Sequence, residues 1–89
     1  MARPLFEAAK QDDLESVRRL AADAAARAER DEHGATALHW AASPRVVEAL
    51  LAAGAEPDAL DREGKSPLYW HAGVSESVRH LLAAGADPR

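Results

Sequence analysis

Four histidines are the side chains in this 89-residue sequence best suited to bind a metal ion or to transfer protons: His33, His39, His71 and His80. Two imidazoles bind zinc together on one helix face when they are four residues apart. No pair here has that spacing, and the sequence contains no cysteine that could supply a thiolate ligand. We therefore expect no metal site and no cofactor.

Two pairs of neighbouring carboxylates could act as general acid and general base, namely Asp12 with Asp13 and Glu56 with Asp58. That chemistry needs a pocket that separates the two pKa values, whereas both pairs lie in polar segments that favour turns. Asp13 is better placed to cap a helix that begins at Leu14. No serine has a base at a suggestive spacing, and no glycine-rich loop could hold a phosphate. We expect no enzymatic activity and no catalytic residue.

Two tryptophans, Trp40 and Trp70, are the aromatic residues most suited to binding, and Tyr69 lies beside the second. Two interpretations stay open. The indole rings could fill gaps that small residues leave between packed helices, or their edges could line a groove and anchor a partner. The answer depends on the elements that position the rings.

Those elements come from an internal repeat, which appears when the sequence is aligned with itself. Residues 50–57 (LLAAGAEP) recur as residues 81–88 (LLAAGADP), with seven of the eight positions identical. Upstream, residues 31–40 align with residues 61–70, so the two tryptophans occupy equivalent positions. A weaker copy begins at residues 5–9. The chain is therefore predicted to contain three copies of one structural unit.

Start and stop signals divide each unit into two short helices and a loop. Gly54 and Gly85 follow the last apolar residues and are typical of helix C-termini. Residues 55–64 are polar, contain a proline and are predicted to form an extended loop with a tight turn. Serine or threonine N-caps, two of them followed by proline, mark the helix starts at Thr36, Ser43-Pro44, Ser66-Pro67 and Ser75.

One unit cannot bury its apolar stripe alone, so the three units must stack side by side. Alanines are predicted at the closest contacts between the stacked helices, where little volume is available. The residues predicted to form the shared core are Leu5, Ala8, Ala9, Leu14, Val17, Leu20, Leu38, Ala41, Ala42, Val47, Leu50, Leu51, Leu68, Ala72, Val78, Leu81 and Leu82.

The middle unit resembles an ankyrin repeat. Residues 34–42 (GATALHWAA) carry the family's Thr-Pro-Leu-His motif as Thr-Ala-Leu-His, and residues 46–55 (VVEALLAAGA) carry its Leu-Leu pair and Gly-Ala ending. Residues 64–69 (GKSPLY) resemble the same motif. The resemblance implies an all-α ankyrin-repeat solenoid of three helix-turn-helix repeats joined by β-turn or hairpin-like loops. It covers one domain, residues 1–89, with an N-terminal capping repeat (1–30), a middle repeat (31–60) and a C-terminal capping repeat (61–89).

The sequence departs from the family pattern at several points. The turn between the helices is shorter by three residues in the second repeat and by two in the third, and such compact repeats resemble those of bacterial ankyrin proteins. Ala24 replaces the stop glycine of the first repeat, so that helix is expected to run on or to end less cleanly. The resemblance implies that His39 bonds loop backbone of a neighbouring repeat. His71 replaces a small residue, and a buried imidazole there needs a polar partner.

Composition and charge restrict the classes of partner. Hydrophobic residues make up 47% of 89, or 42, and 22 of these are alanine, which excludes a bulky β-sandwich core and fits short, closely packed helices. The net charge of -4 argues against nucleic acid or an anionic membrane as partner. No segment has the length and apolar character of a membrane span or a signal peptide. We expect a soluble, cytoplasmic protein.

The negative charge is concentrated in the middle repeat. Residues 31–60 carry five acidic residues and one basic residue, whereas residues 1–30 carry six of each and residues 61–89 four of each. One interpretation is an ordinary solvated acidic surface. The other is that the acidic side chains steer a basic partner, with Asp31, Glu32, Glu56 and Asp58 as the candidates.

The resemblance implies that the chain binds another protein, and loop tips on a rigid stack can vary without disturbing the core. We therefore expect binding through the loop tips and the adjacent concave face. The residues predicted to contact the partner are Glu32, His33, Ala35, Trp40, Arg62, Glu63, Lys65 and Trp70. The alternative is an assembly role, in which the chain self-associates or forms part of a larger ankyrin protein.

Polar residues at both ends of the array favour a complete, monomeric stack over a segment of a longer one, because terminal repeats of a solenoid need polar outer faces. The residues in question are Arg3, Glu7, Lys10 and Gln11 in the first repeat and Ser77 and His80 in the last.

Overall fold

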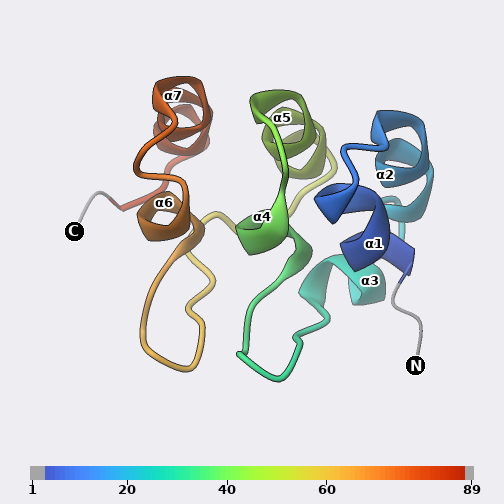
Figure 1. The fold of residues 1–89 in the computed structure, drawn as a ribbon, viewed down its shortest axis with the longest axis horizontal. Coiled ribbons are helices and arrows are strands. Elements are labelled where there is room, and N and C mark those ends of the chain that lie inside the picture. The colour runs from blue at the N-terminus through green and yellow to red at the C-terminus, as the bar shows by residue number, and fades with distance from the viewer. Residues whose placement is uncertain (1–3, 88–89) are drawn as a thin grey trace.

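The computed structural model describes residues 4–87, and over that range the chain forms seven helices and no strands. Helices α2, α5 and α7 lie side by side in one row, helices α1, α4 and α6 form a second row, and two long loops project beyond the second row (Figure 1). The predicted all-α solenoid is confirmed. The helices are α1 (Pro4–Lys10), α2 (Leu14–Leu20), α3 (Ala24–Ala28), α4 (Ala37–Trp40), α5 (Pro44–Ala52), α6 (Pro67–Trp70) and α7 (Ser75–Ala83).

Side-chain caps start three of these helices, α2, α5 and α6, where the sequence predicts them. The Asp13 carboxylate accepts a hydrogen bond from the Ser16 N–H at 3.2 Å, at the start of α2. Ser43 and Ser66 cap α5 and α6 in the same way, each with a proline at the first helical turn. These caps satisfy N–H groups that have no partner inside the helix.

Ser75 is not a cap, contrary to the prediction. Helix α7 begins at Ser75 itself, and Val74 occupies the N-cap position without a side-chain hydrogen bond. The reason is local: the Val74 N–H bonds the His71 carbonyl at 2.9 Å, and the Val74 carbonyl accepts the first helical hydrogen bond, from Val78, at 3.0 Å. The turn after α6 is therefore closed by backbone alone.

The first repeat contains a helix that the sequence analysis did not predict. Instead of running on, α2 ends at Leu20, and Asp23 then caps α3 by accepting a hydrogen bond from the Ala25 N–H at 2.9 Å. An aspartate followed by three alanines is a strong helix start, because alanine has the highest helix propensity. In the first repeat α3 lies near the base of the loop segment (Figure 1).

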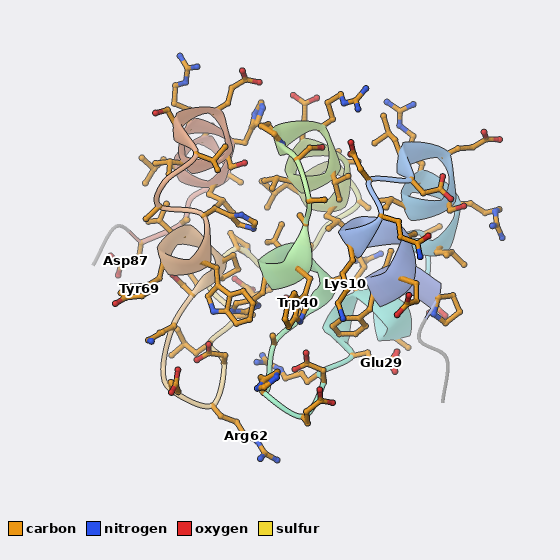
Figure 2. The ribbon with its side chains drawn as sticks, in the orientation of Figure 1. Lys10, Glu29, Trp40, Arg62, Tyr69 and Asp87 are labelled. Atoms are coloured by element: carbon orange, nitrogen blue, oxygen red, sulfur yellow. The ribbon has the colours of Figure 1, made fainter. Side chains whose placement is uncertain are left out.

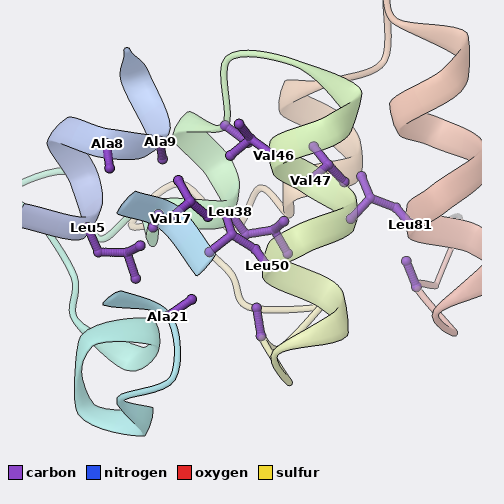
Figure 3. Close-up of a cluster of buried hydrophobic side chains, with 14 residues drawn as sticks. Leu5, Ala8, Ala9, Val17, Ala21, Leu38, Val46, Val47, Leu50 and Leu81 are labelled. Atoms are coloured by element: carbon purple, nitrogen blue, oxygen red, sulfur yellow. The ribbon is translucent and has the colours of Figure 1, made fainter. Parts of the chain in front are cut away.

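The core runs through the contacts between the two rows of helices (Figure 3). Val17, Val47, Leu50 and Leu81 are completely buried, and Leu38 is 1% exposed, as predicted. The alanines in and beside helices α1 and α4 also behave as close contacts, since the buried set includes Ala8, Ala9 and Ala41. The residues predicted as core but only partly buried are Leu14, Leu20, Leu51, Leu68 and Val78.

Three predicted core residues are exposed, namely Ala42, Ala72 and Leu82. Helices α4 and α6 end at Trp40 and Trp70, so the two alanines fall in the short links beyond the helices, where the backbone turns towards solvent. Leu82 lies on the outward side of α7 and is 42% exposed.

The end of the array at the third repeat is less polar than expected. Ser77 occupies the position of Val46 in the preceding repeat and is 1% exposed, so it faces the interior and adds nothing to the outer surface. His80 is partly buried, with Nδ1 3.7 Å from Glu48 Oε2. The large apolar side chains exposed on and beside this repeat are Leu60, Tyr69, Val74 and Leu82.

Two residues that the sequence-based expectations include are not described by the structure. Arg3, expected on the outer side of the first repeat, and Pro88, which ends the duplicated segment, lie outside the described residues. The longest helices, α5 and α7, have nine residues each, and no helix within residues 4–87 could span a bilayer.

Candidate partner-binding groove between the loop tips

The two loop tips, residues 31–35 and 61–65, are built around the aspartate that begins each of them. Asp31 Oδ1 accepts hydrogen bonds from the N–H groups of His33 and Ala35, both at 2.9 Å. The Asp31 N–H in turn bonds the Ala35 carbonyl at 3.0 Å, and Gly34 adopts a φ of 73° to close the turn. Together these bonds hold the backbone of residues 31–35 in a single turn.

The second loop tip repeats the same construction. Asp61 Oδ1 accepts hydrogen bonds from Glu63 and Lys65, both at 2.8 Å, and the Asp61 N–H bonds the Lys65 carbonyl at 2.9 Å. Gly64 has a φ of 78°. The two tips are therefore rigid copies of one turn.

The second carboxylate oxygen of each aspartate holds an indole. Trp40 donates its Nε1–H to Asp31 Oδ2 at 2.7 Å, and Trp70 donates to Asp61 Oδ2 at 2.9 Å. Burial raises the pKa of Asp31, but hydrogen bonds from Ala35 and Trp40 outweigh this effect and lower the pKa. Hydrogen bonds from Lys65 and Trp70 likewise lower the pKa of Asp61. Both aspartates are thus ionised and hold the turn and the indole together.

The indoles meet each other across the repeats. Their ring centroids are 4.9 Å apart with an interplanar angle of 77°, an edge-to-face contact that aromatic rings favour. Trp70 also contacts the His39 ring at 5.1 Å, and the Lys10 ammonium lies 4.5 Å from the centroid of Trp40. Both indoles keep partly exposed surface. They therefore fill a gap between repeats and also keep surface that faces solvent. That they anchor a partner stays a prediction.

Two buried histidines join the second and third repeats. The Thr36 N–H donates to His39 Nδ1 at 3.0 Å, so the proton of the neutral ring is on Nε2, which donates to the Lys65 carbonyl at 3.1 Å. His71 Nε2 lies 2.9 Å from the Leu38 carbonyl. Burial lowers the pKa of His39 and favours its neutral form. The structural role that the resemblance implied for His39 is confirmed, and His71 has the polar partner that its burial requires.

The loop tips are also bonded to each other. The Arg62 N–H donates to the His33 carbonyl at 2.9 Å. Arg30, which the sequence analysis did not single out, donates through Nη1 to the carbonyls of Gly34 and Leu60. Spacing along the chain gave no signal for this role, because Leu60 is 30 residues from Arg30.

A hollow of about 490 Å³ lies between the loop tips. Six of the eight residues predicted to bind a partner line it, and Asp61, which was not predicted, is the seventh. A second, adjacent hollow is lined by Lys65 and Tyr69. The side chains shared by the two hollows are Asp61, Glu63 and Trp70. The lining residues of the first hollow are Glu32, His33, Trp40, Asp61, Arg62, Glu63 and Trp70.

Ala35 does not belong to this surface. It is completely buried, because its N–H and carbonyl both bond Asp31 and turn the residue towards the core. The expectation that Ala35 is accessible to a partner is therefore wrong. Ala35 is the last residue of the turn in sequence, but the chain re-enters the stack at this residue.

Charged side chains around the hollow form exposed pairs. Lys65 Nζ lies 3.3 Å from Glu63 Oε1, and the hydrogen bond from Lys65 to Glu63 raises the pKa of the lysine. The same ammonium lies 5.1 Å from the Tyr69 ring centroid. Glu32 Oε1 is 3.8 Å from His33 Nε2. Such exposed pairs contribute little to stability and can exchange partners.

The carboxylates considered for catalysis have structural contacts. Asp12 accepts a hydrogen bond from the Ser43 hydroxyl at 2.7 Å and lies 3.2 Å from Arg45, which ties the first repeat to the second. Asp58 accepts a hydrogen bond from the Asp87 N–H at 2.8 Å. Between residues 4 and 87, no three or more histidine, aspartate or glutamate side chains are grouped so that they could hold a metal ion.

Comparison with known proteins agrees with this architecture. Residues 5–89 match the family described as ankyrin repeats in three copies. Over 63 residues the chain is 41% identical to inversin-A of Xenopus laevis. The aligned segment covers 62% of this chain and 6% of inversin-A. Over 88 residues it is 35% identical to the ankyrin repeat domain-containing protein SAT10 of Stachybotrys chartarum, covering 93% of this chain and 5% of that protein. The chain thus spans about one twentieth of these relatives, and it belongs to the ankyrin repeat family.

Proposed function

We propose that this chain binds a protein partner through the groove between its loop tips, with Trp40 and Trp70 at the base of the groove. Ankyrin repeats are in general protein-interaction modules and not enzymes. The observation that carries the proposal is the pair of indoles held by Asp31 and Asp61 below two rigid loop tips. Preorganised aromatic side chains make good anchors, because little conformational entropy is lost when a partner covers them.

The charges around the groove support a partner that is not a nucleic acid. Glu32, Asp61 and Glu63 line the hollow together with one guanidinium, that of Arg62. Phosphate groups would be repelled by this excess of carboxylates. A cytoplasmic setting and a monomeric state, which the sequence suggests, stay predictions.

The proposal is tested with the triple variant R62A/E63A/K65A. These substitutions remove exposed side chains of the second loop tip but retain its backbone hydrogen bonds and the Lys65 carbonyl that His39 contacts. The immobilised chain is exposed to an extract of its source cells, and the retained proteins are identified. We expect at least one protein that the wild type retains to be lost by the variant, while the melting temperature changes little.

A charge-matched control is E15A/R18A/R19A. It removes one acidic and two basic exposed side chains, as the test variant does, but from α2, in the row formed by α2, α5 and α7. The control should retain the same proteins as the wild type. Equal retention by the loop-tip variant, or equal loss by both variants, would contradict the assignment of this groove.

A second candidate function is self-association through the end of the array at the third repeat. The observation in its favour is the set of exposed apolar side chains there, including Tyr69 at 64% and Leu82 at 42% exposure. Burying such a surface against a second copy would be favourable. Sedimentation over a range of concentrations decides the question, because a monomer at every concentration excludes this function.

A further inference from the structure

If the proposed function holds, the side chains that line the hollow between the loop tips restrict the chemical class of partner that can bind there. Its base is formed by the partly exposed indoles of Trp40 and Trp70, and its walls carry the carboxylates of Glu32 and Glu63. Arg62 also lines the hollow, and the end of its side chain extends from the tip of its loop away from the body of the molecule (Figure 2), so three carboxylates with that of Asp61 stand against one guanidinium. The lining therefore combines aromatic surface with negative charge.

The rings in and beside this hollow already attract cations within the protein itself. The Lys10 ammonium lies 4.5 Å from the Trp40 ring centroid, and the Lys65 ammonium lies 5.1 Å from that of Tyr69. Indole is the strongest of the aromatic side chains in this interaction. Each indole also donates its N–H to an ionised aspartate, and this bond pushes electron density onto the ring and makes its face more attractive to a positive charge.

We infer that the hollow between the loop tips binds an arginine side chain of the partner protein. A guanidinium is planar and weakly hydrated, so it can stack on an indole while its N–H groups bond a carboxylate in the same plane. Glu63 is suited to accept those bonds, because it borders the hollow from the loop and its side chain is 74% exposed. The ammonium group of a lysine is not planar, so it cannot stack on an indole and bond a carboxylate in the same plane.

The internal partner of Glu63 does not block this site. Lys65 Nζ is 3.3 Å from Glu63 Oε1, but the pair is exposed, and exposed ion pairs are weak and exchange readily. The arriving guanidinium would take the place of Lys65 at Glu63, and Lys65 would keep its contact with Tyr69. Steering by the acidic middle repeat, which carries five acidic residues and one basic residue, also favours a basic segment.

Short peptides test the inference without knowledge of the partner. The probe is acetyl-Gly-Arg-Gly-amide, and its matched controls carry citrulline, which has the shape of arginine without the charge, or lysine. Binding is followed by the indole N–H signals in nitrogen-15 NMR spectra, because both tryptophans of the chain line the hollow. We expect saturable shifts of an indole signal with the arginine peptide and affinity about tenfold lower for citrulline.

Variants locate the binding. E63Q removes the proposed carboxylate and should weaken the arginine peptide about threefold or more, without a change in melting temperature. E76Q removes an exposed carboxylate from the first turn of α7, in the row formed by α2, α5 and α7, and should leave the affinity unchanged. The inference is overturned if no indole signal shifts, if citrulline or lysine binds as well as arginine, or if E63Q and E76Q have the same effect.

The outcomes separate this inference from the function on which it rests. If the arginine peptide fails to bind but R62A/E63A/K65A loses a protein that the wild type retains, the arginine assignment is wrong and the groove still binds a partner. If the loop-tip variant retains every partner, the proposed function is wrong irrespective of the peptide result.

Discussion

The Nε2 atom of His39 lies 3.1 Å from the carbonyl oxygen of Lys65, so helix α4 of the second repeat is bonded directly to the loop tip of the third. In the opposite direction, His71 of the third repeat contacts the Leu38 carbonyl of the second. The second and third repeats therefore depend on each other for the hydrogen bonds of a buried side chain. This mutual dependence fixes the distance between the loop tips and hence the shape of the groove.

Replacing His39 by alanine should destabilise the fold strongly. The imidazole is 1% exposed, and its loss leaves the Thr36 N–H and the Lys65 carbonyl without their partner and opens a cavity. We expect the free energy of unfolding in urea to fall by about 2–4 kcal/mol. H33A is the control, because the His33 side chain is 61% exposed, and its effect should stay within about 0.5 kcal/mol. Equal effects of the two substitutions would refute the structural role of His39.

Stability should fall as the pH drops below about 6.5. The pKa of His39 is lowered by burial in the folded chain, so between its ordinary and its folded pKa the unfolded chain binds a proton that the folded chain does not. The stability from His39 is complete above the ordinary pKa and is lost as the pH falls towards the folded value. H39Q cannot titrate, so its free energy of unfolding should change less between pH 8 and pH 5. A slope equal to that of the wild type would contradict the assignment.

The bond between Asp31 and Trp40 should be measurable as a coupling energy. D31N keeps an oxygen for the turn but places an amide against the indole N–H, and W40F removes the indole N–H from the other side. A double-mutant cycle over D31N and W40F should give a coupling of about 1 kcal/mol, a modest value because Asp31 is only partly buried. Additive effects would show that the bond does not contribute.

The lowered pKa of Asp31 also predicts a loss of stability as the pH falls below about 4.

The repeats, the positions of the capped helices and most of the core could be predicted from the sequence, because caps, glycine stops and apolar spacing are local signals. The paired turn aspartates also left a local signal: Asp31 and Asp61 each precede a tryptophan by nine residues. That signal becomes interpretable only when the turn brings the two side chains together. The repeat pattern does not predict helix α3, because its cap Asp23 falls where the other repeats have Ala53 and Ala84.

The contacts that set the width of the groove could not be predicted from the sequence. Arg30 bonds the Leu60 carbonyl, and the backbone of Arg62 bonds that of His33, across about thirty residues. Backbone acceptors carry no sequence signature, so only the packing of the repeats shows which of them an arginine can reach. The burial of Ala35 and Ser77 depends in the same way on neighbours from other parts of the chain.

The contact between the loop tips can be tested at two equivalent glycines. Gly34 and Gly64 both have a positive φ, 73° and 78°, so alanine is strained at either position. A Cβ atom on Gly34 would lie 2.9 Å from the backbone nitrogen of Arg62, whereas a Cβ atom on Gly64 meets no atom within 4 Å. Because that nitrogen bonds the His33 carbonyl, G34A must push the two loop tips apart, and G64A must not.

We expect G64A to cost about 1 kcal/mol, the strain of a left-handed alanine, and G34A to cost about 1–2 kcal/mol more. Urea unfolding of both variants measures the difference, and G64A is the matched control because the backbone strain is common to both. G34A should also widen the hollow and weaken any ligand that contacts both loop tips, whereas G64A should not. Equal stabilities would mean that the loop tips can separate without cost, and the groove would then be flexible instead of preorganised.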